Sequence, residues 1–497
     1  MSIRILLIDT PSTIASRRDL PRVNVPFAAL YLASSLRRAG FASVIYDPKL
    51  TLDIHPWKSV FYTGDSLDRI GARIRKEKPD LIGITNLLSK DTGVALAIAG
   101  QAKAVCPSAI VAIGGFPATA CPQDILTSPH VDIAAMGEGE QTVVELARRI
   151  KAKGPFADVN GIAYRDEKGA VAVTPPRVPG DNLPPFPDYS LIDLEQYFRL
   201  AAQGFAARPL SIGKRTLSLF TSRGCPFHCF FCGAHAIVGR RFRAYPAVVV
   251  ADHVQDMVRR YGIDSVEFED DNVSADRRRF GAIVDALSAF RPRLAWATPN
   301  GIRADTLVNR DLLEKVKNSG CSYLTIGVES GDQEFLSGTI HKALDLGTVS
   351  RLARLCREVG IPLNAFFIAG FPDETVAQMY ATLAFAHKLH RRFRVYPFIN
   401  FAIPLRGTDM YGVCSEKGYL AREITPEVLT ASMSFRGKGL IKTGDFTPQQ
   451  VGALMIRFNR QVLLDELKAM ILHPAFAWKR LRSVFNSLPR VKRYFLG

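Results

Sequence analysis

Three cysteines within eight residues, Cys225, Cys229 and Cys232, most constrain what this chain can fold into. Their spacing, Cys-x3-Cys-x2-Cys, places three thiolates on one short loop, and no fourth cysteine stands nearby. A closed electron-transfer cluster normally has four thiolate ligands. The spacing therefore predicts a 4Fe-4S cluster with one open iron, a place where a molecule can bind and be reduced.

Two other roles for these cysteines follow from general chemistry. They could belong to a structural zinc site with His228 or His235 as fourth ligand, although such sites usually have two separated pairs of ligands and no second pair follows. A disulfide scaffold is disfavoured because the 497-residue chain holds only eight cysteines, and three at this spacing would strain any bridge. The cluster is the preferred interpretation, and zinc is the alternative.

The residues around the cysteines predict a strand that leads into an apolar loop. Residues 216–221 alternate and are rich in strand formers, and Arg223-Gly224 ends the strand. Aromatic side chains in the loop would exclude water from a cluster and influence its potential: Phe227, Phe230 and Phe231.

The form Cys-x3-Cys-x-aromatic-Cys, completed by Phe231 and placed behind a strand, resembles the radical SAM superfamily. The resemblance implies that the open iron chelates the amino and carboxylate groups of S-adenosylmethionine (SAM). One electron from the cluster would then cleave the sulfonium to give a 5′-deoxyadenosyl radical. A flavodoxin- or ferredoxin-type electron donor is therefore an expected partner.

Residues 1–151 alternate between strand and helix patterns. Strands are expected at residues 3–8, 43–46, 80–85, 110–113 and 131–136, with helices at 28–39, 67–78, 92–105 and a last one ending at 151. This alternation predicts a doubly wound parallel sheet, in which ligands bind beyond the carboxyl ends of the strands.

Glycine-rich motifs at those strand ends resemble the cobalamin-binding domain that precedes the catalytic core in one large radical SAM class. The motifs are Ile-Gly-Ile-Thr at 82–85, Ile-Gly-Gly-Phe-Pro-Ala-Thr at 113–119, and Val-Asp followed by Gly-Glu-Gly-Glu within 131–140. The resemblance implies cobalamin contacts from four loops: Asp9, Thr10 and Pro11; Leu87, Leu88 and Ser89; Gly114, Gly115 and Phe116; Gly137, Glu138 and Gly139. Many cobalamin domains have a cobalt-binding His two residues after the first Asp, but this chain has Pro11, so no protein histidine is expected on cobalt.

Residues 152–210 are predicted to connect two domains through a hairpin at 161–173 and a proline-rich strap at 175–187. Strands and helices alternate again over residues 211–435. The alternation alone allows a full barrel or a second doubly wound sheet. The cysteine loop after the first strand, with the later motifs in order, favours an open (β/α)6 partial barrel like the radical SAM core.

The same resemblance assigns SAM contacts, whereas no catalytic side chain or general base stands out. Glu269, Asp270 and Asp271 match the position that binds the SAM amino group, or they cap a helix. Arg303 would pair with the SAM carboxylate or form a surface salt bridge. The remaining expected contacts are Phe231, Glu329, Ser330, Gly370 and Phe371.

The other cysteines, Cys106, Cys121, Cys321, Cys356 and Cys414, are interpreted as core thiols. Cysteine usage, the absence of a long apolar run and the start of the chain predict a cytoplasmic protein. The formal charge is +17, and residues 470–497 hold six Lys or Arg and no acid. The region 436–497 is expected to be helical, either packed on its own domain or touching the inner face of an anionic membrane. No specific nucleic-acid module is evident.

We therefore expect a cobalamin-dependent radical SAM enzyme that methylates an unactivated carbon of a small-molecule or lipid-like substrate. An alternative is a radical SAM cyclase or oxidoreductase without methyl transfer, like the anaerobic porphyrin cyclase. A third hypothesis, of another class, is a non-catalytic cobalamin-binding regulator, which would need no cluster.

Overall fold

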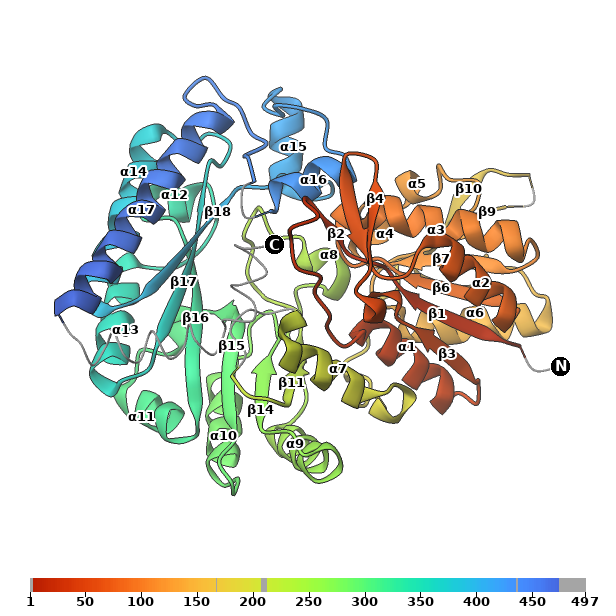
Figure 1. The fold of residues 1–497 in the computed structure, drawn as a ribbon, viewed down its shortest axis with the longest axis horizontal. Coiled ribbons are helices and arrows are strands. Elements are labelled where there is room, and N and C mark those ends of the chain that lie inside the picture. The colour runs from red at the N-terminus through yellow and green to blue at the C-terminus, as the bar shows by residue number, and fades with distance from the viewer. Residues whose placement is uncertain (1–2, 167, 207–211, 435–436, 473–497) are drawn as a thin grey trace.

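A computed structural model describes residues 3–166, 168–206, 212–434 and 437–472 of the chain. Two sheets lie side by side, each with helices packed on it (Figure 1). The first belongs to the N-terminal part of the chain and the second to the part that carries the cysteine loop. The α/β fold class predicted from the alternation is thereby confirmed.

The first sheet has seven strands in the order β10-β9-β8-β7-β6-β1-β3. Its five parallel strands are β1 (Ile5–Asp9), β3 (Ser43–Tyr46), β6 (Leu81–Thr85), β7 (Ile110–Gly114) and β8 (Ile133–Ala135). The hairpin of β9 (Ile162–Arg165) and β10 (Val171–Val173) extends one edge antiparallel. Because β1 lies between β3 and β6, the direction of winding reverses there, and such a reversal opens a crevice at the carboxyl ends of the strands.

Alternating side chains of β1 explain why both faces of this sheet are covered. Ile5 and Leu7 pack with helices α1 (Phe27–Arg38) and α6 (Gly139–Ala152), whereas Leu6 and Ile8 pack with α2 (Leu67–Glu77) and α3 (Thr92–Val105). Successive strand residues point to opposite faces, so a continuous apolar strand fills two cores. The doubly wound arrangement expected for residues 1–151 follows from this packing.

A small antiparallel sheet, not expected from the sequence, stands beside the first sheet. It consists of β2 (Thr13–Ile14), β5 (Val60–Thr63) and β4 (Ile54–Trp57). The two longer strands form a hairpin that hydrogen-bonds with the chain just after β1.

The second sheet has six parallel strands in sequence order: β11 (Thr216–Leu219), β14 (Ser265–Phe268), β15 (Ala295–Ile302), β16 (Cys321–Glu329), β17 (Leu363–Ala369) and β18 (Tyr396–Phe401). Its connections carry the helices α9 (Ala247–Tyr261), α10 (Arg277–Ser288), α11 (Arg310–Asn318), α12 (Gln333–Gly338), α13 (Leu346–Val359) and α14 (Val376–Phe393). Sequential parallel strands with covering helices are the architecture of the predicted (β/α)6 partial barrel. The first strand is followed by β12 (Ser222–Arg223), which pairs with β13 (Arg243–Ala244).

The connector between the sheets is more structured than the predicted strap. After the proline-rich stretch it forms α7 (Leu194–Leu200) and a π-helical turn (Ala201–Phe205). Tyr197 and Phe198 of α7 are buried because this helix faces the space between the sheets. The predicted strap at 175–187 has neither helix nor strand, and the buried aromatic side chains of α7 belong to the residues that follow it.

The region after the second sheet is helical within its described part. It contains α15 (Asp409–Glu416), α16 (Pro426–Ser432) and α17 (Pro448–Leu472). Of these described helices, only α17 falls in the range 436–497 that was expected to be helical. Helix α17 packs on α14, whereas α16 returns to the first sheet and contacts the turn at Ser89–Asp91. Most of the basic segment 470–497 lies outside the described residues. No described helix is long and apolar enough to cross a membrane.

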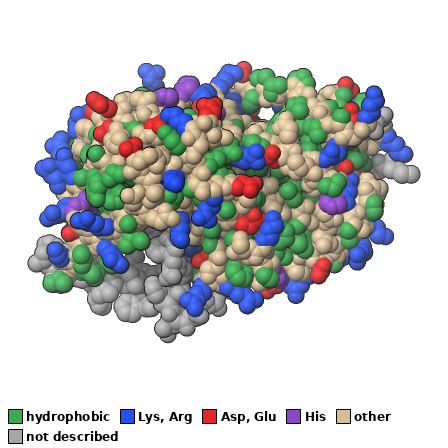
Figure 2. Space-filling view, turned by 90° about the horizontal axis from the view of Figure 1, so that it is seen from above, with side chains coloured by type: hydrophobic (Ala, Val, Ile, Leu, Met, Phe, Trp, Pro, Cys, Tyr) green, Lys and Arg blue, Asp and Glu red, His purple; other side chains and the backbone are tan. Residues whose placement is uncertain are grey.

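Lys and Arg side chains are spread over the face shown in Figure 2, with Asp and Glu among them. The excess of positive charge in the sequence is therefore not gathered into one stripe on this face.

Candidate functional site

The cysteine loop begins directly after β12, with all three cysteines half-buried. Aromatic rings wall it on one side: the centroids of Phe230, Phe231 and Phe335 lie 5.7, 5.8 and 5.9 Å from that of Phe371. Gly224 has φ +86°, and an added Cβ would lie 2.2 Å from the carbonyl oxygen of Arg241, so glycine is required where the loop starts.

The donor chemistry of this loop fits an iron–sulfur cluster. Burial raises the pKa of all three thiols, to about 11 for Cys232, so they are protonated thiols near neutral pH when no metal is bound. Binding of metal would deprotonate them. The positive charges of Lys342 and Arg303 lower the pKa of the Cys225 and Cys229 thiols and so oppose the effect of burial. They would stabilise thiolates at these positions. Among the described residues, no three His, Cys, Asp or Glu side chains are arranged around a single metal ion.

Asp270 holds the segment that leads into the loop. Its carboxylate accepts hydrogen bonds from the Thr221 amide at 3.1 Å, the Thr221 hydroxyl at 2.8 Å and the Ser222 hydroxyl. Arg279 donates to the Thr221 carbonyl at 2.8 Å from the other side. The sequence reasoning assigned Asp270 to the SAM amino group, but its bonds instead support the loop.

The neighbours of Asp270 face a different environment. Glu269 and Asp271 line a cavity, and Asn300 donates to the Glu269 carbonyl at 2.6 Å. Of the three acids predicted together, the structure therefore brings two to the open space and one to the loop.

Arg303 and Glu329 both lie near the cysteine loop and both have partners. The Arg303 guanidinium stacks 3.8 Å from the centroid of Phe227 and donates twice to Asp305 at 3.0 Å. Glu329 forms a buried ion pair with Lys342 at 2.8 Å. Lys342 comes from the turn after α12, and no motif in the sequence pointed to it.

Ser330, Gly370 and Phe371 also lie at strand ends, next to β16 and β17. The Ser330 hydroxyl hydrogen-bonds with Thr382 at 3.2 Å. The amides of Gly370 and Phe371 donate to the buried carboxylate of Glu374 at 2.7 and 3.0 Å. Glu374 was missed by the sequence analysis, although a carboxylate closing the turn Gly-Phe-Pro-Asp-Glu was a readable signal.

A cavity of 870 Å³ lies between the two sheets, at the carboxyl ends of their strands. Nine of the twelve residues predicted to contact cobalamin line it: Leu87, Leu88, Ser89, Gly114, Gly115, Phe116, Gly137, Glu138 and Gly139. From the second sheet and the segments that follow its strands, it is lined by Thr216, Ser218, Ser222, Arg223, Glu267, Glu269, Asp271 and Asn300. A volume near the upper end of ordinary ligand pockets suits a large cofactor or substrate.

The cavity fits cobalamin because it continues as a slot between the first sheet and its helices. Small residues of the sheet form one wall, namely Gly83, Ala112 and Ala135, and the facing wall has Leu32 of α1 with Val143 and Leu146 of α6. At Gly115, φ is +119° and an added Cβ would lie 2.0 Å from the Asn86 carbonyl oxygen, so glycine lets two lining loops touch. Such a slot can accept a flat ring such as the base of the cofactor's nucleotide tail.

Asp9, Thr10 and Pro11 do not line this cavity. Asp9 is half-buried, forms an ion pair with the buried Lys49 and accepts a hydrogen bond from Thr85, while Thr10 and Pro11 are buried. The loop at residues 9–11, predicted to contact cobalamin, therefore packs within the first domain and does not face the cavity.

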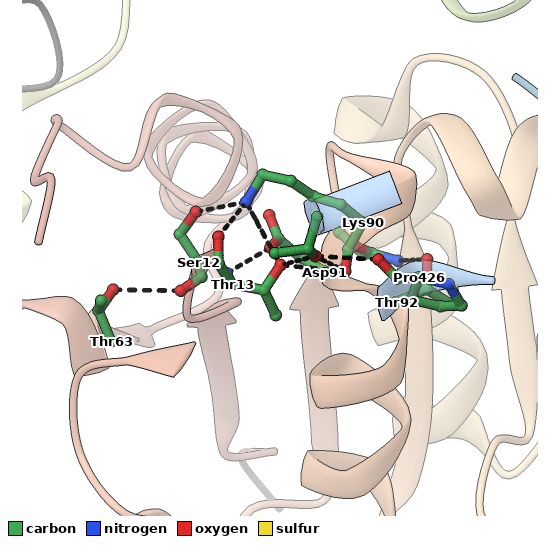
Figure 3. Close-up of polar contacts among 9 residues, drawn as sticks. Ser12, Thr13, Thr63, Lys90, Asp91, Thr92 and Pro426 are labelled. Atoms are coloured by element: carbon green, nitrogen blue, oxygen red, sulfur yellow. Dashed lines mark hydrogen bonds and ion pairs between the residues drawn. The ribbon is translucent and has the colours of Figure 1, made fainter. Parts of the chain in front are cut away.

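The loop that presents Leu87 and Leu88 is held by a polar network (Figure 3). Lys90 donates to the Ser12 hydroxyl at 2.8 Å, the Thr13 carbonyl at 2.9 Å and Asp91 at 2.8 Å. Thr13 bonds to Asp91 through its amide and its hydroxyl, and its hydroxyl also meets that of Thr430 in α16 at 2.7 Å. The C-terminal region thus supports a cavity-lining loop of the first domain.

The remaining cysteines divide into two groups. Cys321, Cys356 and Cys414 are buried core thiols, as predicted. Cys106 and Cys121 are half-buried, because they lie at helix ends rather than within a helix or strand.

Comparison with known proteins agrees with this geometry. Residues 19–147 match the model of the B12 binding domain, and residues 219–386 match that of the radical SAM superfamily. The chain is 29% identical to the cytidylyl-2-hydroxyethylphosphonate methyltransferase of Streptomyces wedmorensis, over 92% of this chain and 89% of that protein. It is 26% identical to an anaerobic magnesium-protoporphyrin IX monomethyl ester cyclase of Rubrivivax gelatinosus, over 73% of this chain and 61% of that protein.

The fold is similar to that of the radical SAM methyltransferase TsrM from Kitasatospora setae with cobalamin and a [4Fe-4S] cluster bound. The TM-score is 0.66 at 20% identity, covering 85% of this chain and 80% of that chain. The two family matches in this order, with the cysteine loop and the cavity between their domains, show that the chain belongs to the cobalamin-binding radical SAM proteins, whose cofactors are a 4Fe-4S cluster, SAM and cobalamin.

Proposed function

We propose that this chain is a cobalamin-dependent radical SAM methyltransferase that adds a methyl group to an unactivated carbon of a small molecule. The observation that carries the proposal is the shared cavity, lined both by the cobalamin-domain loops and by strand ends of the partial barrel. When bound, the cofactors supply a radical able to remove a hydrogen atom and a methyl group able to replace it. A single shared cavity lets both act on one substrate.

The chain's own residues would bind and shield the reactants. Cys225, Cys229 and Cys232 would ligate the cluster, and Phe231, Glu269, Asp271, Arg303, Glu329, Ser330, Gly370 and Phe371 remain the proposed SAM contacts. Leu87, Leu88, Ser89, Gly114, Gly115, Phe116, Gly137 and Gly139 would hold cobalamin. Phe116, Phe220, Ile237 and Leu405 line the cavity with apolar surface and would keep water from reactive species.

The lining suits a substrate with an apolar part and a polar end. Most of the cavity is apolar, whereas Thr216, Ser218 and Asn300 bring polar groups to its barrel side. A lipid-like substrate also agrees with α17, where Leu463, Leu467 and Ile471 are exposed at and just before the start of the basic segment 470–497. We include contact of that segment with the inner face of an anionic membrane, a cytoplasmic location and a flavodoxin- or ferredoxin-type reductant in the proposal.

A cyclase or oxidoreductase without methyl transfer is the second candidate, supported by the similarity to the porphyrin cyclases. One experiment separates the two. The chain is reconstituted anaerobically with iron, sulfide, cobalamin and methyl-deuterated SAM, and the products are analysed by mass spectrometry. A methyltransferase yields S-adenosylhomocysteine together with 5′-deoxyadenosine, whereas a cyclase yields only 5′-deoxyadenosine. An intact cluster that gives no 5′-deoxyadenosine would contradict both.

A further inference from the structure

Two acidic and two basic side chains meet between the cobalamin domain and the cysteine loop. Glu138 and Glu140 come from the start of α6, and Arg223 and Arg243 come from β12 and β13. Arg223 donates to Glu140 at 2.5 Å and lies 3.3 Å from Glu138, while Arg243 donates to Glu138 at 3.2 Å and through a second, shorter bond. We call these four residues the four-charge cluster.

The arginines of the cluster need these carboxylates. Arg223 and Arg243 are directly opposite each other on paired strands, an arrangement that is destabilising for like charges. Only 14% and 3% of their side chains are exposed, so water can screen the repulsion little. Glu138 is shared between both guanidiniums, and Glu140 adds the second negative charge, so the buried group is neutral as a whole.

The position of the cluster links two cofactor sites. Arg223 precedes Cys225 by two residues, and the intervening Gly224 is tightly packed against the backbone at Arg241. Glu138 lies in the loop after β8 whose glycines line the cobalamin cavity. A movement of this loop would therefore be transmitted to the start of the cysteine loop through Arg223, and through Arg243, which is paired with it.

We propose that the four-charge cluster is a positioning device that fixes the spacing between the cobalamin loop and the cysteine loop. Glu138 acts through Arg223 and Arg243, and is a positioning residue rather than a cobalamin ligand. Methyl transfer needs both cofactors to reach one carbon, and SAM cleavage needs only the cysteine loop. Loss of the four-charge cluster should therefore impair methyl transfer while SAM cleavage continues. The expected change in product ratio rests on the proposed function, whereas the expected change in the distance between the cofactors is tested separately by spectroscopy.

The test compares Glu138→Gln and Glu138→Asp with a matched control. The control is Asp124→Asn, which breaks an ion pair of 2.7 Å between Asp124 of the first domain and Arg406, which follows the second sheet; both side chains are about half exposed. Exposed pairs contribute about 0–1 kcal/mol, so this contact between domains is expected to matter little.

Each variant is loaded with the 4Fe-4S cluster and cobalamin. EPR then measures the dipolar coupling between cob(II)alamin and the reduced 4Fe-4S cluster, which depends on the distance between them. We expect Glu138→Gln to change the value of this dipolar coupling or to widen its distribution. The coupling in Glu138→Asp should lie between those of Glu138→Gln and the wild type. The ratio of S-adenosylhomocysteine to 5′-deoxyadenosine should fall about 10- to 100-fold in Glu138→Gln, the range for a misplacement of about 1 Å. Asp124→Asn should match the wild type in both measurements.

Two results would overturn the inference. The first is a Glu138→Gln protein that is loaded with both cofactors and has the wild-type dipolar coupling and the wild-type product ratio. The second applies if Glu138→Gln takes up no 4Fe-4S cluster, and it is a wild-type dipolar coupling in Glu138→Asp. A wild-type protein that forms no S-adenosylhomocysteine would contradict the proposed methyl transfer instead, while the EPR coupling would still judge the positioning role.

Discussion

Replacing Lys49 by methionine should strongly destabilise the cobalamin domain. The Lys49 ammonium, only 4% exposed, bonds with Asp9 and with Asp47 at 3.0 Å. Asp47 is 1% exposed on its side chain and also accepts a hydrogen bond from Tyr197 at 3.0 Å. Methionine has a similar length and no charge, so the change leaves two neighbouring carboxylates without their shared cation.

The expected cost is about 3–5 kcal/mol, the usual penalty for removing one partner of a buried ion pair. For a unit of 150–250 residues, about 1 kcal/mol corresponds to about 2–4 °C in Tm, so the first unfolding transition should fall by about 6–20 °C. The control is Lys315→Met, whose partner Asp285 and own side chain are both 56% exposed, and it should cost less than about 1 kcal/mol.

The pH dependence gives a second check on this reasoning. Burial raises the pKa of Asp47, and Lys49 opposes that rise, so the variant should have a still higher pKa in its folded state. A carboxyl whose folded pKa is raised contributes stability at low pH that is lost as the pH rises through that pKa. The deficit of Lys49→Met should therefore shrink between pH 7.5 and pH 5. Thermal unfolding followed by circular dichroism measures it, and a deficit equal to that of Lys315→Met, or independent of pH, would refute the argument.

Three further predictions follow from other parts of the structure. Cys229→Ala should lose the cluster, seen as loss of bound iron and of charge-transfer absorbance, whereas Cys321→Ala in β16 should retain both. Glu374 has a pKa raised by burial to about 7, so its contribution to stability should fall by up to about 3 kcal/mol as the pH rises from about 4.5 to 7, and Glu374→Gln should flatten the dependence of Tm on pH over that window. Thr430→Val removes the hydroxyl that meets Thr13, and should weaken cobalamin binding about 5- to 10-fold in an absorbance titration while iron content stays constant.

The sequence predicts the fold well where one residue pattern decides an element. Strands β1, β6 and β7 are largely buried apolar runs and β3 is a half-buried edge strand, and the structure has all four within two residues of the expected bounds. The hairpin β4–β5 was missed because His55 and Pro56 interrupt any apolar alternation, and its strands form through pairing with each other and with β2. Helix α7 was missed because its stability comes from packing against the cavity between domains, which no local pattern records.

The candidate site divides in the same way. The cysteine loop is local and could be predicted from its spacing. The partners of Asp270 and Glu138 could not, since each depends on which segments meet in space: Glu138 precedes α6, and Arg243 is 105 residues away in β13. A polar residue at a strand end is expected to touch ligand or protein, and only the packing decides which.

The contacts between the two domains are not equivalent, and the difference has a functional meaning. The four-charge cluster and the network around Lys90 and Asp91 are buried and lie at loops that line the cavity, whereas the Arg406–Asp124 pair is exposed. Buried networks hold side chains in a fixed geometry, although burying their charges costs desolvation energy. Exposed ion pairs lose little hydration and also fix the geometry little. The buried contacts are thus concentrated where the spacing of cofactors matters. Because Thr430 comes from α16, after the last strand of the barrel, the C-terminal region supports the loop that presents Leu87 and Leu88 to the cavity.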